Sequence, residues 1–86
     1  MLASYHKNFK KSYKKLSVKV IQKVNERILL FLEDPFNSQL NNHSLSGKYN
    51  GYRSINISGD LRAIYKLLNI NLAHFIKIDT HSNLYK

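Results

Sequence analysis

Apolar residues near the start of the chain recur with the period of a helix. Phe9, Tyr13 and Leu16 follow one another at intervals of four and three, and lysines fill most of the positions between them. An apolar stripe with this spacing and a charged remainder is typical of a short amphipathic helix. The pattern predicts such a helix from about Lys7, with a basic outer face.

A second, longer helix is predicted directly after the first. Ser17 is suited to cap its N-terminus, because a serine hydroxyl accepts a hydrogen bond from the first turn. Pro35 ends it, since the residue before a proline is pushed out of the helical region. The apolar positions in between repeat at intervals of three and four: Ile21, Val24, Ile28 and Phe31 or Leu32.

The second half of the chain changes to stretches rich in Ile, Tyr and Leu, which favour strands. Short turns at residues 58–60 and 69–71 make consecutive strands antiparallel neighbours. His74 is expected to share one strand face with Ile76 and Ile78. Three strands are predicted, over Tyr52–Ile57, Leu61–Leu68 and Leu72–Ile78.

These elements predict a single α+β domain over residues 1–86. Residues 2–6 form a candidate edge strand, and residues 36–50 have no sustained period, so they are expected to be a loop with one helical turn. The order is then β-α-α-β-β-β, with two N-terminal helices packed on a small twisted antiparallel sheet. A hydrophobic fraction of 43% against 22% charged residues is typical of a folded chain.

The charge balance narrows the class of partner. Fourteen Lys and Arg against five Asp and Glu give a formal charge of +9, which attracts nucleic acid, an anionic membrane surface or an acidic protein. Basic residues in the predicted helices either are a solvated face or follow phosphates. The sequence has no long apolar run and no signal-peptide pattern, so a cytoplasmic protein without a membrane partner is expected. Without cysteine, disulfides and thiolate zinc sites are excluded.

Two of the four histidines are candidates for chemistry. His43 and His81 lie in predicted loops or strand ends beside small polar residues, where functional groups concentrate. An imidazole titrates near neutral pH and can exchange protons with a hydroxyl or a leaving oxygen. The histidines are too scattered in the sequence to predict a metal site, and His74 is expected to be a core or edge residue.

Charged residues around the predicted strands add further candidates. Arg62 lies inside an otherwise apolar strand, and a guanidinium projecting from a sheet suits a phosphate. Arg53 is either an ordinary surface charge or a phosphate ligand. Asp60 is either a turn residue or a group that orients a histidine or arginine, or takes part in acid–base chemistry.

Taken jointly, several motifs resemble the RelE/ParE superfamily of bacterial type II toxins, and within it the YafQ-like mRNA interferases. The N-terminal half resembles the family only in the order of its elements. The motifs cover about half of the chain and comprise His43-x-Leu45-x-Gly47, Gly51-Tyr52-Arg53, Asp60 followed by Ile64-Tyr65-Lys66, and Thr80-His81-Ser82 with Leu84-Tyr85.

The resemblance implies a microbial-ribonuclease-like fold and a ribosome-dependent endoribonuclease without a metal or other cofactor. In such enzymes an RNA 2′-hydroxyl attacks the adjacent phosphate, which needs a base, an acid and positive charge on the phosphorane. The implied partners are an acidic antitoxin protein, mRNA in the ribosomal A site and ribosomal RNA. By resemblance the catalytic residues are His43, Asp60, Arg62, His81 and Tyr85, and the RNA-binding residues are Lys48, Arg53, Asn56 and Lys66.

Two positions depart from the family pattern. Asn56 stands where a histidine is usual, and an amide cannot exchange protons at neutral pH. Asp79 stands where glycine is frequent, so its carboxylate either approaches His81 or points away. Two alternatives therefore stay open: a ParE-like inhibitor of DNA gyrase that does not cleave, and a degenerate module that binds antitoxin without cleaving.

Overall fold

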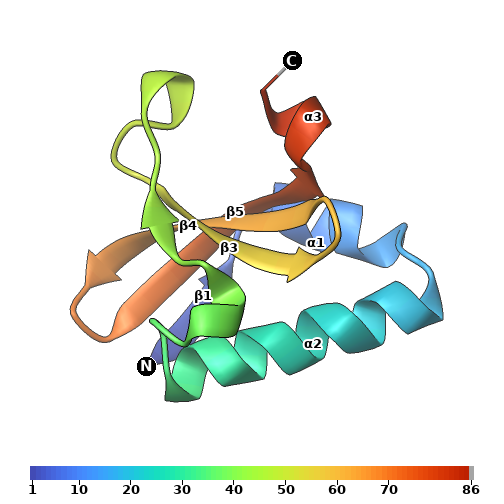
Figure 1. Cartoon of the computed structure of the whole chain (residues 1–86), viewed down its shortest axis with the longest axis horizontal. Coiled ribbons are helices and arrows are strands. Elements are labelled where there is room, and N and C mark those ends of the chain that lie inside the picture. Colours follow the sequence, from blue (N-terminus) through green and yellow to red (C-terminus); the bar gives the residue numbers. More distant parts are fainter. Residues whose placement is uncertain (86) are drawn as a thin grey trace.

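A five-stranded mixed sheet forms the centre of the computed structural model, which describes residues 1–85 (Figure 1). Three helices accompany it: α1 (Lys7–Lys14), α2 (Val18–Glu33) and α3 (His81–Leu84). The strands are β1 (Leu2–Tyr5), β2 (His43–Ser44), β3 (Arg53–Ser58), β4 (Leu61–Asn69) and β5 (Leu72–Thr80), with two 3-10 turns, η1 (Ser38–Leu40) and η2 (Gly47–Tyr49).

Side-chain caps place the two long helices where the sequence predicted them. The Ser17 hydroxyl accepts a hydrogen bond from the Val20 amide at 3.3 Å, and α2 ends at Glu33, immediately before Asp34 and Pro35. At α1 the cap is His6, whose Nδ1 accepts from the Asn8 amide at 3.0 Å. Both caps satisfy amides that the first helical turn leaves unpaired.

The sheet has the strand order β1-β5-β4-β3-β2, which confirms the α+β class but corrects the predicted antiparallel sheet. The short turns do make β3, β4 and β5 antiparallel neighbours. β1 instead pairs in parallel with β5, with Ser4 opposite His74. Only a short turn forces the antiparallel direction, and β1 is separated from β5 by both helices and the rest of the sheet.

Two short elements were missed because they depend on tertiary pairing. His43 was expected in a loop, but it lies in β2, opposite Ser54 of β3. The chain after β5 forms α3, whose cap is the Thr80 hydroxyl accepting from the Asn83 amide at 3.3 Å. Strands and helices of two to four residues carry too little periodicity to be detected in a sequence.

A bulge in β5 changes which residues share a face. Tyr65 pairs with Phe75 and its neighbour Ile64 pairs with Lys77, so Ile76 is the extra residue. The predicted common face for His74, Ile76 and Ile78 is therefore wrong: Ile78 packs in the main core, on the side of Phe75. A bulge adds one residue to one strand and so shifts the alternation of side chains beyond it.

The two faces of the sheet have different cover. Figure 1 shows α2 below the sheet, and the segment containing η2 together with α3 above it. The upper side, called here the open face, carries a small cluster of Tyr49, Ile64 and Leu84. The main core lies on the helix side and consists of Phe9, Val24, Ile28, Phe31, Leu40, Ile55, Ile57, Ala63, Tyr65, Ala73, Phe75 and Ile78.

Within residues 1–85, no helix has the length and apolar character needed to cross a membrane.

Candidate active site

Three of the predicted catalytic residues meet at one corner of the sheet, where the β3–β4 turn lies beside the start of α3. The Asp60 carbonyl accepts a hydrogen bond from the His81 amide at 2.8 Å, and its carboxylate accepts from the Ser82 hydroxyl at 3.4 Å. Arg62 folds back over the same turn and donates to the Gly59 carbonyl at 2.8 Å. The fold thus brings the backbone of His81 beside Asp60, with Arg62 on the same turn.

His81, the first residue of α3, and Tyr85, the residue after its end, lie side by side. Their ring centroids are 5.0 Å apart, and the Tyr85 amide donates to the His81 carbonyl at 3.3 Å. Leu84, which is 1% exposed, anchors the helix on the open face. Tyr85 also meets Tyr49 of η2 edge-on at 5.8 Å. The histidine itself is exposed, so a substrate can reach it.

The Asp79 carboxylate holds the start of α3. Its Oδ1 accepts from the Thr80 amide at 2.8 Å and from the Asn83 side-chain amide at 3.1 Å. These bonds direct the carboxylate toward the helix backbone and Asn83. Asp79 therefore helps to place His81 through the helix that carries it.

His43 lies on the open face, at the edge strand β2. It pairs with Ser54, which pairs with Ile64 of β4. Two strand spacings of about 4.8 Å put the Cα atoms of His43 and Ile64 about 10 Å apart. Its Nδ1 is 2.7 Å from the Asn41 carbonyl, and a carbonyl only accepts, so this nitrogen carries the proton. The Nε2 of the neutral ring is then left as a proton acceptor.

Asn56 lies between His43 and the corner. It pairs with Arg62, which in turn pairs with Asp79 on β5, so the three side chains form one row across the open face. The Asn56 Oδ1 is buried and has no hydrogen-bond partner among residues 1–85. A buried acceptor of this kind is costly unless a donor reaches it.

The predicted RNA-binding cations separate into two groups. Lys48 and Lys66 are exposed, and each ammonium lies over a tyrosine ring, at 5.3 Å from the centroid of Tyr49 and 5.6 Å from that of Tyr52. Arg53 borders the same hollow as Lys66, but its side-chain hydrogen bond is made elsewhere. Its position on β3 alternates with that of Ser54, so its side chain leaves the sheet on the helix side.

Arg53 takes part in a structural contact that includes Asn42, a residue that the sequence did not single out. The Asn42 Oδ1 accepts from Arg53 Nε at 2.9 Å and from the Tyr65 hydroxyl at 3.0 Å. Its side-chain amide donates to the Pro35 carbonyl at 2.9 Å. Asn42 therefore ties the loop after α2 to the sheet, one residue before His43. In a stretch rich in Asn and Ser, no local signal distinguishes it.

Replacing Asn42 with alanine is expected to lower the free energy of unfolding by about 2 kcal/mol, because the buried Tyr65 hydroxyl loses its partner. Urea denaturation measures the change. Asn50→Ala, at an exposed position of the same loop region, is the matched control and should cost less than about 0.5 kcal/mol. Equal losses in the two variants would contradict the role assigned to Asn42.

Within residues 1–85, no three His, Asp or Glu side chains are grouped so as to hold a metal ion.

The sequence did not single out Tyr49 either, although its ring connects η2 to Tyr85 at the end of α3. Its position between Gly47 and Gly51 indicates a tight turn, but the contact with Tyr85 depends on the fold. The open face is thus bordered by η2 on one side and α3 on the other (Figure 1).

Solved structures of small bacterial toxins have the same fold. YafQ from E. coli strain BL21(DE3) has 24% sequence identity and a TM-score of 0.81 over 98% of this chain and 97% of that chain. YafQ in the E. coli DinJ-YafQ toxin-antitoxin complex gives 24% and 0.78, over 98% and 96% of the two chains. The YoeB/ParE toxin from Agrobacterium tumefaciens gives 20% and 0.77, over 94% and 99%.

A comparison with curated proteins gave no match. The family model described as "Bacterial toxin of type II toxin-antitoxin system, YafQ" matches residues 1–86, which is the whole chain. This chain therefore belongs to the YafQ family of bacterial type II toxins.

Proposed function

We propose that this toxin is a ribosome-dependent mRNA endoribonuclease. The observation that carries the proposal is the corner at which Asp60, Arg62 and His81 meet, on the side of the sheet that also holds His43. A carboxylate, a guanidinium and two imidazoles on one exposed face are the groups that phosphodiester transfer requires. A protein that acted only by binding would have no need of them.

The proposed reaction uses the RNA 2′-hydroxyl as nucleophile. A base takes its proton as the 2′-oxygen bonds to phosphorus, and an acid gives a proton to the 5′-oxygen as the phosphorus–oxygen bond breaks. The products are a 2′,3′-cyclic phosphate and a 5′-hydroxyl. His43, Asp60 and His81 supply the base and the acid. One guanidinium nitrogen of Arg62 donates to the Gly59 carbonyl of the turn, and the other N–H groups donate to the phosphorane.

The remaining predicted groups have supporting roles in this proposal. Tyr85 beside His81 positions a base or sugar of the substrate. Because the Asn56 Oδ1 is buried, Asn56 donates to the substrate through its side-chain N–H groups. Lys48 and Lys66 bring RNA phosphates to the open face. The side chain of Arg53 leaves the sheet on the other side and bonds Asn42, so Arg53 is not part of the proposed site.

The proposed partners follow from charge and from family membership. A formal charge of +9 favours an acidic antitoxin, and the E. coli relative was solved as the DinJ-YafQ toxin-antitoxin complex. The same charge favours ribosomal RNA and the mRNA in the A site. The proposed place of action is the cytoplasm, where translated messages are found.

Mapping of 5′ ends on translated messages tests the activity. Expression of the wild-type chain should produce new 5′-hydroxyl ends within coding regions. His43→Ala should reduce their number by roughly 100-fold, the lower range for an acid or base. Identical end profiles for wild type and variant would exclude His43 from the chemistry. Inhibition of gyrase supercoiling in vitro, without new message ends, would instead support the ParE-like alternative.

Asn56 favours a second candidate, a module that binds antitoxin without cleaving. An amide at this position removes one proton-transferring group from the row that contains Arg62. The same mapping distinguishes the two candidates. A wild-type chain that binds its antitoxin but yields no new message ends supports the second.

A further inference from the structure

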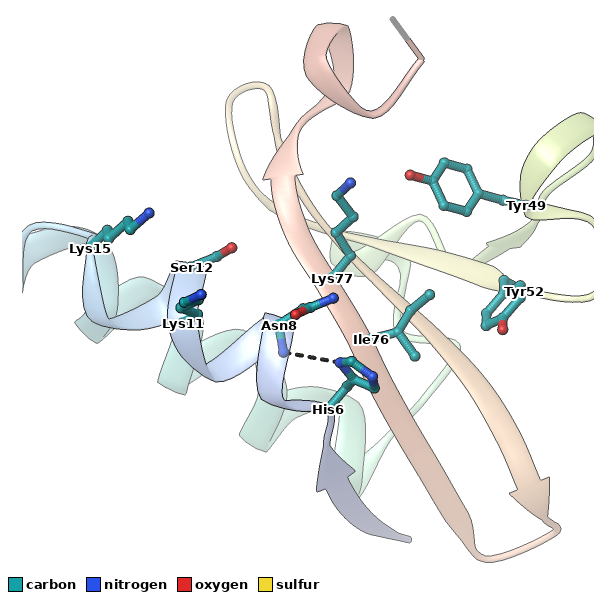
Figure 2. A pocket seen from close by; sticks show the side chains of 9 residues that line it. All are labelled: His6, Asn8, Lys11, Ser12, Lys15, Tyr49, Tyr52, Ile76 and Lys77. Atoms are coloured by element: carbon teal, nitrogen blue, oxygen red, sulfur yellow. Dashed lines mark hydrogen bonds between the residues drawn. The ribbon is translucent and has the colours of Figure 1, made fainter.

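A hollow of about 500 Å³ lies on the open face next to the candidate active site, and none of the predicted catalytic residues lines it. In Figure 2, α1 forms one wall with Lys11 and Lys15, and β5 forms the floor with Ile76 and Lys77. Tyr49 and Tyr52 stand on the opposite side. We call this hollow the α1 groove.

The α1 groove has three lysines in its lining and no carboxylate. Lys11, Lys15 and Lys77 line it, and none of the five acidic residues of the chain does. Lys11 and Lys15 are one helical turn apart, which places their Cβ atoms about 6 Å from each other on the same side of α1. Lys77 rises from β5 between α1 and the two tyrosines (Figure 2). Three ammonium groups around one depression match an anion that carries several charges.

The other side of the α1 groove is formed by aromatic side chains, with Ile76 beside them. Tyr52 is half-buried, and it also lines a neighbouring hollow that contains Lys66, whose ammonium is 5.6 Å from the ring centroid. Ile76 is the extra residue of the β5 bulge, which turns its side chain away from the main core and into the cluster around Tyr49. An acidic peptide would use only the lysines. RNA would use both the lysines and the aromatic surface.

The α1 groove continues from the candidate active site. Lys77 lies in the row of the sheet that runs through Ile64 to Ser54 and His43. Tyr49, at the other side of the groove, contacts Tyr85, which stacks beside His81. A strand that passes over the open face would therefore leave it along α1.

We propose that the α1 groove binds the single-stranded RNA segment adjacent to the cleaved phosphate. In it Lys11, Lys15 and Lys77 neutralise phosphates, and Tyr52 stacks on a base. This inference rests on the proposed nuclease function, because that function identifies the open face as the path of the message.

Binding of an uncleavable RNA tests the lysines. A 2′-O-methyl oligoribonucleotide has no free 2′-hydroxyl, so its affinity reports binding alone. Replacing Lys11, Lys15 and Lys77 with alanine should reduce the slope of log affinity against log salt concentration by about 2, at about 0.7 per single-strand phosphate contact. The matched control replaces Lys7, Lys10 and Lys14, which are exposed on the same helix but do not line the groove. It removes the same charge and should change the slope by less than about 0.7.

Tyr52→Leu tests the aromatic side of the groove. The variant keeps an apolar side chain but removes the ring, and it should weaken RNA binding roughly tenfold, as expected for the loss of one base stack. Binding of poly-L-glutamate, which has no bases, should not change. An equal effect of Tyr52→Leu on both polymers, or none on RNA, would overturn the stacking role.

Failure of this inference can be separated from failure of the nuclease proposal. If both lysine triples bind the uncleavable RNA equally, while wild type still cuts messages, the groove assignment is wrong and the nuclease proposal stands. If wild type binds RNA through the groove but cuts no message, the nuclease proposal is wrong. Selective loss of poly-L-glutamate binding in the groove triple would assign the groove to an acidic protein and overturn the RNA assignment.

Discussion

Replacing His81 with alanine is expected to reduce message cleavage by about 100- to 10,000-fold, the range for removal of a general acid or base. The histidine is exposed at the start of α3, and its backbone amide, which alanine keeps, makes the bond to the Asp60 carbonyl. The helix is anchored by Leu84 and capped by Thr80, neither of which is changed. The loss should therefore be in the chemistry and leave the fold intact.

Cleavage rates in a reconstituted translation reaction measure this effect, with thermal denaturation of each variant as the test of folding. His74→Gln is the matched control, because His74 is an imidazole on the same sheet whose Nδ1 is 2.7 Å from the Ser4 hydroxyl. It should retain cleavage within about threefold of wild type. Normal cleavage by a folded His81→Ala protein would mean that the acid and base are found elsewhere, with Asp60 and His43 as the remaining candidates.

Local signals were sufficient for the long elements of the fold. The intervals of three and four in α2, with Ser17 before it and Pro35 after it, determine a helix without reference to the rest of the chain. The turns on either side of β4 likewise determine antiparallel neighbours. Where the sequence failed, the cause was a contact made across the fold. The parallel pairing of β1 and the extra residue Ile76 both depend on which strand lies alongside.

The candidate site shows the same division. A charged residue inside an apolar strand was enough to single out Arg62, and the structure places it at the corner with Asp60. The neighbouring positions needed coordinates. Arg53 and Ser54 are adjacent in β3, and successive side chains of a strand point to opposite faces of the sheet. Arg53 therefore points to the helix side, where it bonds Asn42, and Ser54 points to the open face, where it pairs with His43. The roles of these groups stay predictions until variants are measured.

The largest effect on stability is expected at Phe31. Its side chain is fully buried, and its ring centroid is 4.8 Å from that of Tyr65 and 5.5 Å from that of Phe75, so it joins α2 to β4 and β5. Phe31→Ala removes most of the side chain from a packed core and should lower the free energy of unfolding by about 3–5 kcal/mol. Folded domains have only about 5–15 kcal/mol in total, so the variant should be close to unfolding.

Urea denaturation of Phe31→Ala and Phe36→Ala, each compared with wild type, tests this prediction. Phe36, five residues later, undergoes the same chemical change but is 69% exposed. The Arg53 guanidinium lies over its ring, 5.4 Å from the centroid. Replacing Phe36 should cost about 0.5–1 kcal/mol. Because the composition change is identical, the difference between the variants measures burial. Similar losses at the two positions would mean that α2 does not pack on the sheet through Phe31, and that the helix side of the sheet is not the main core.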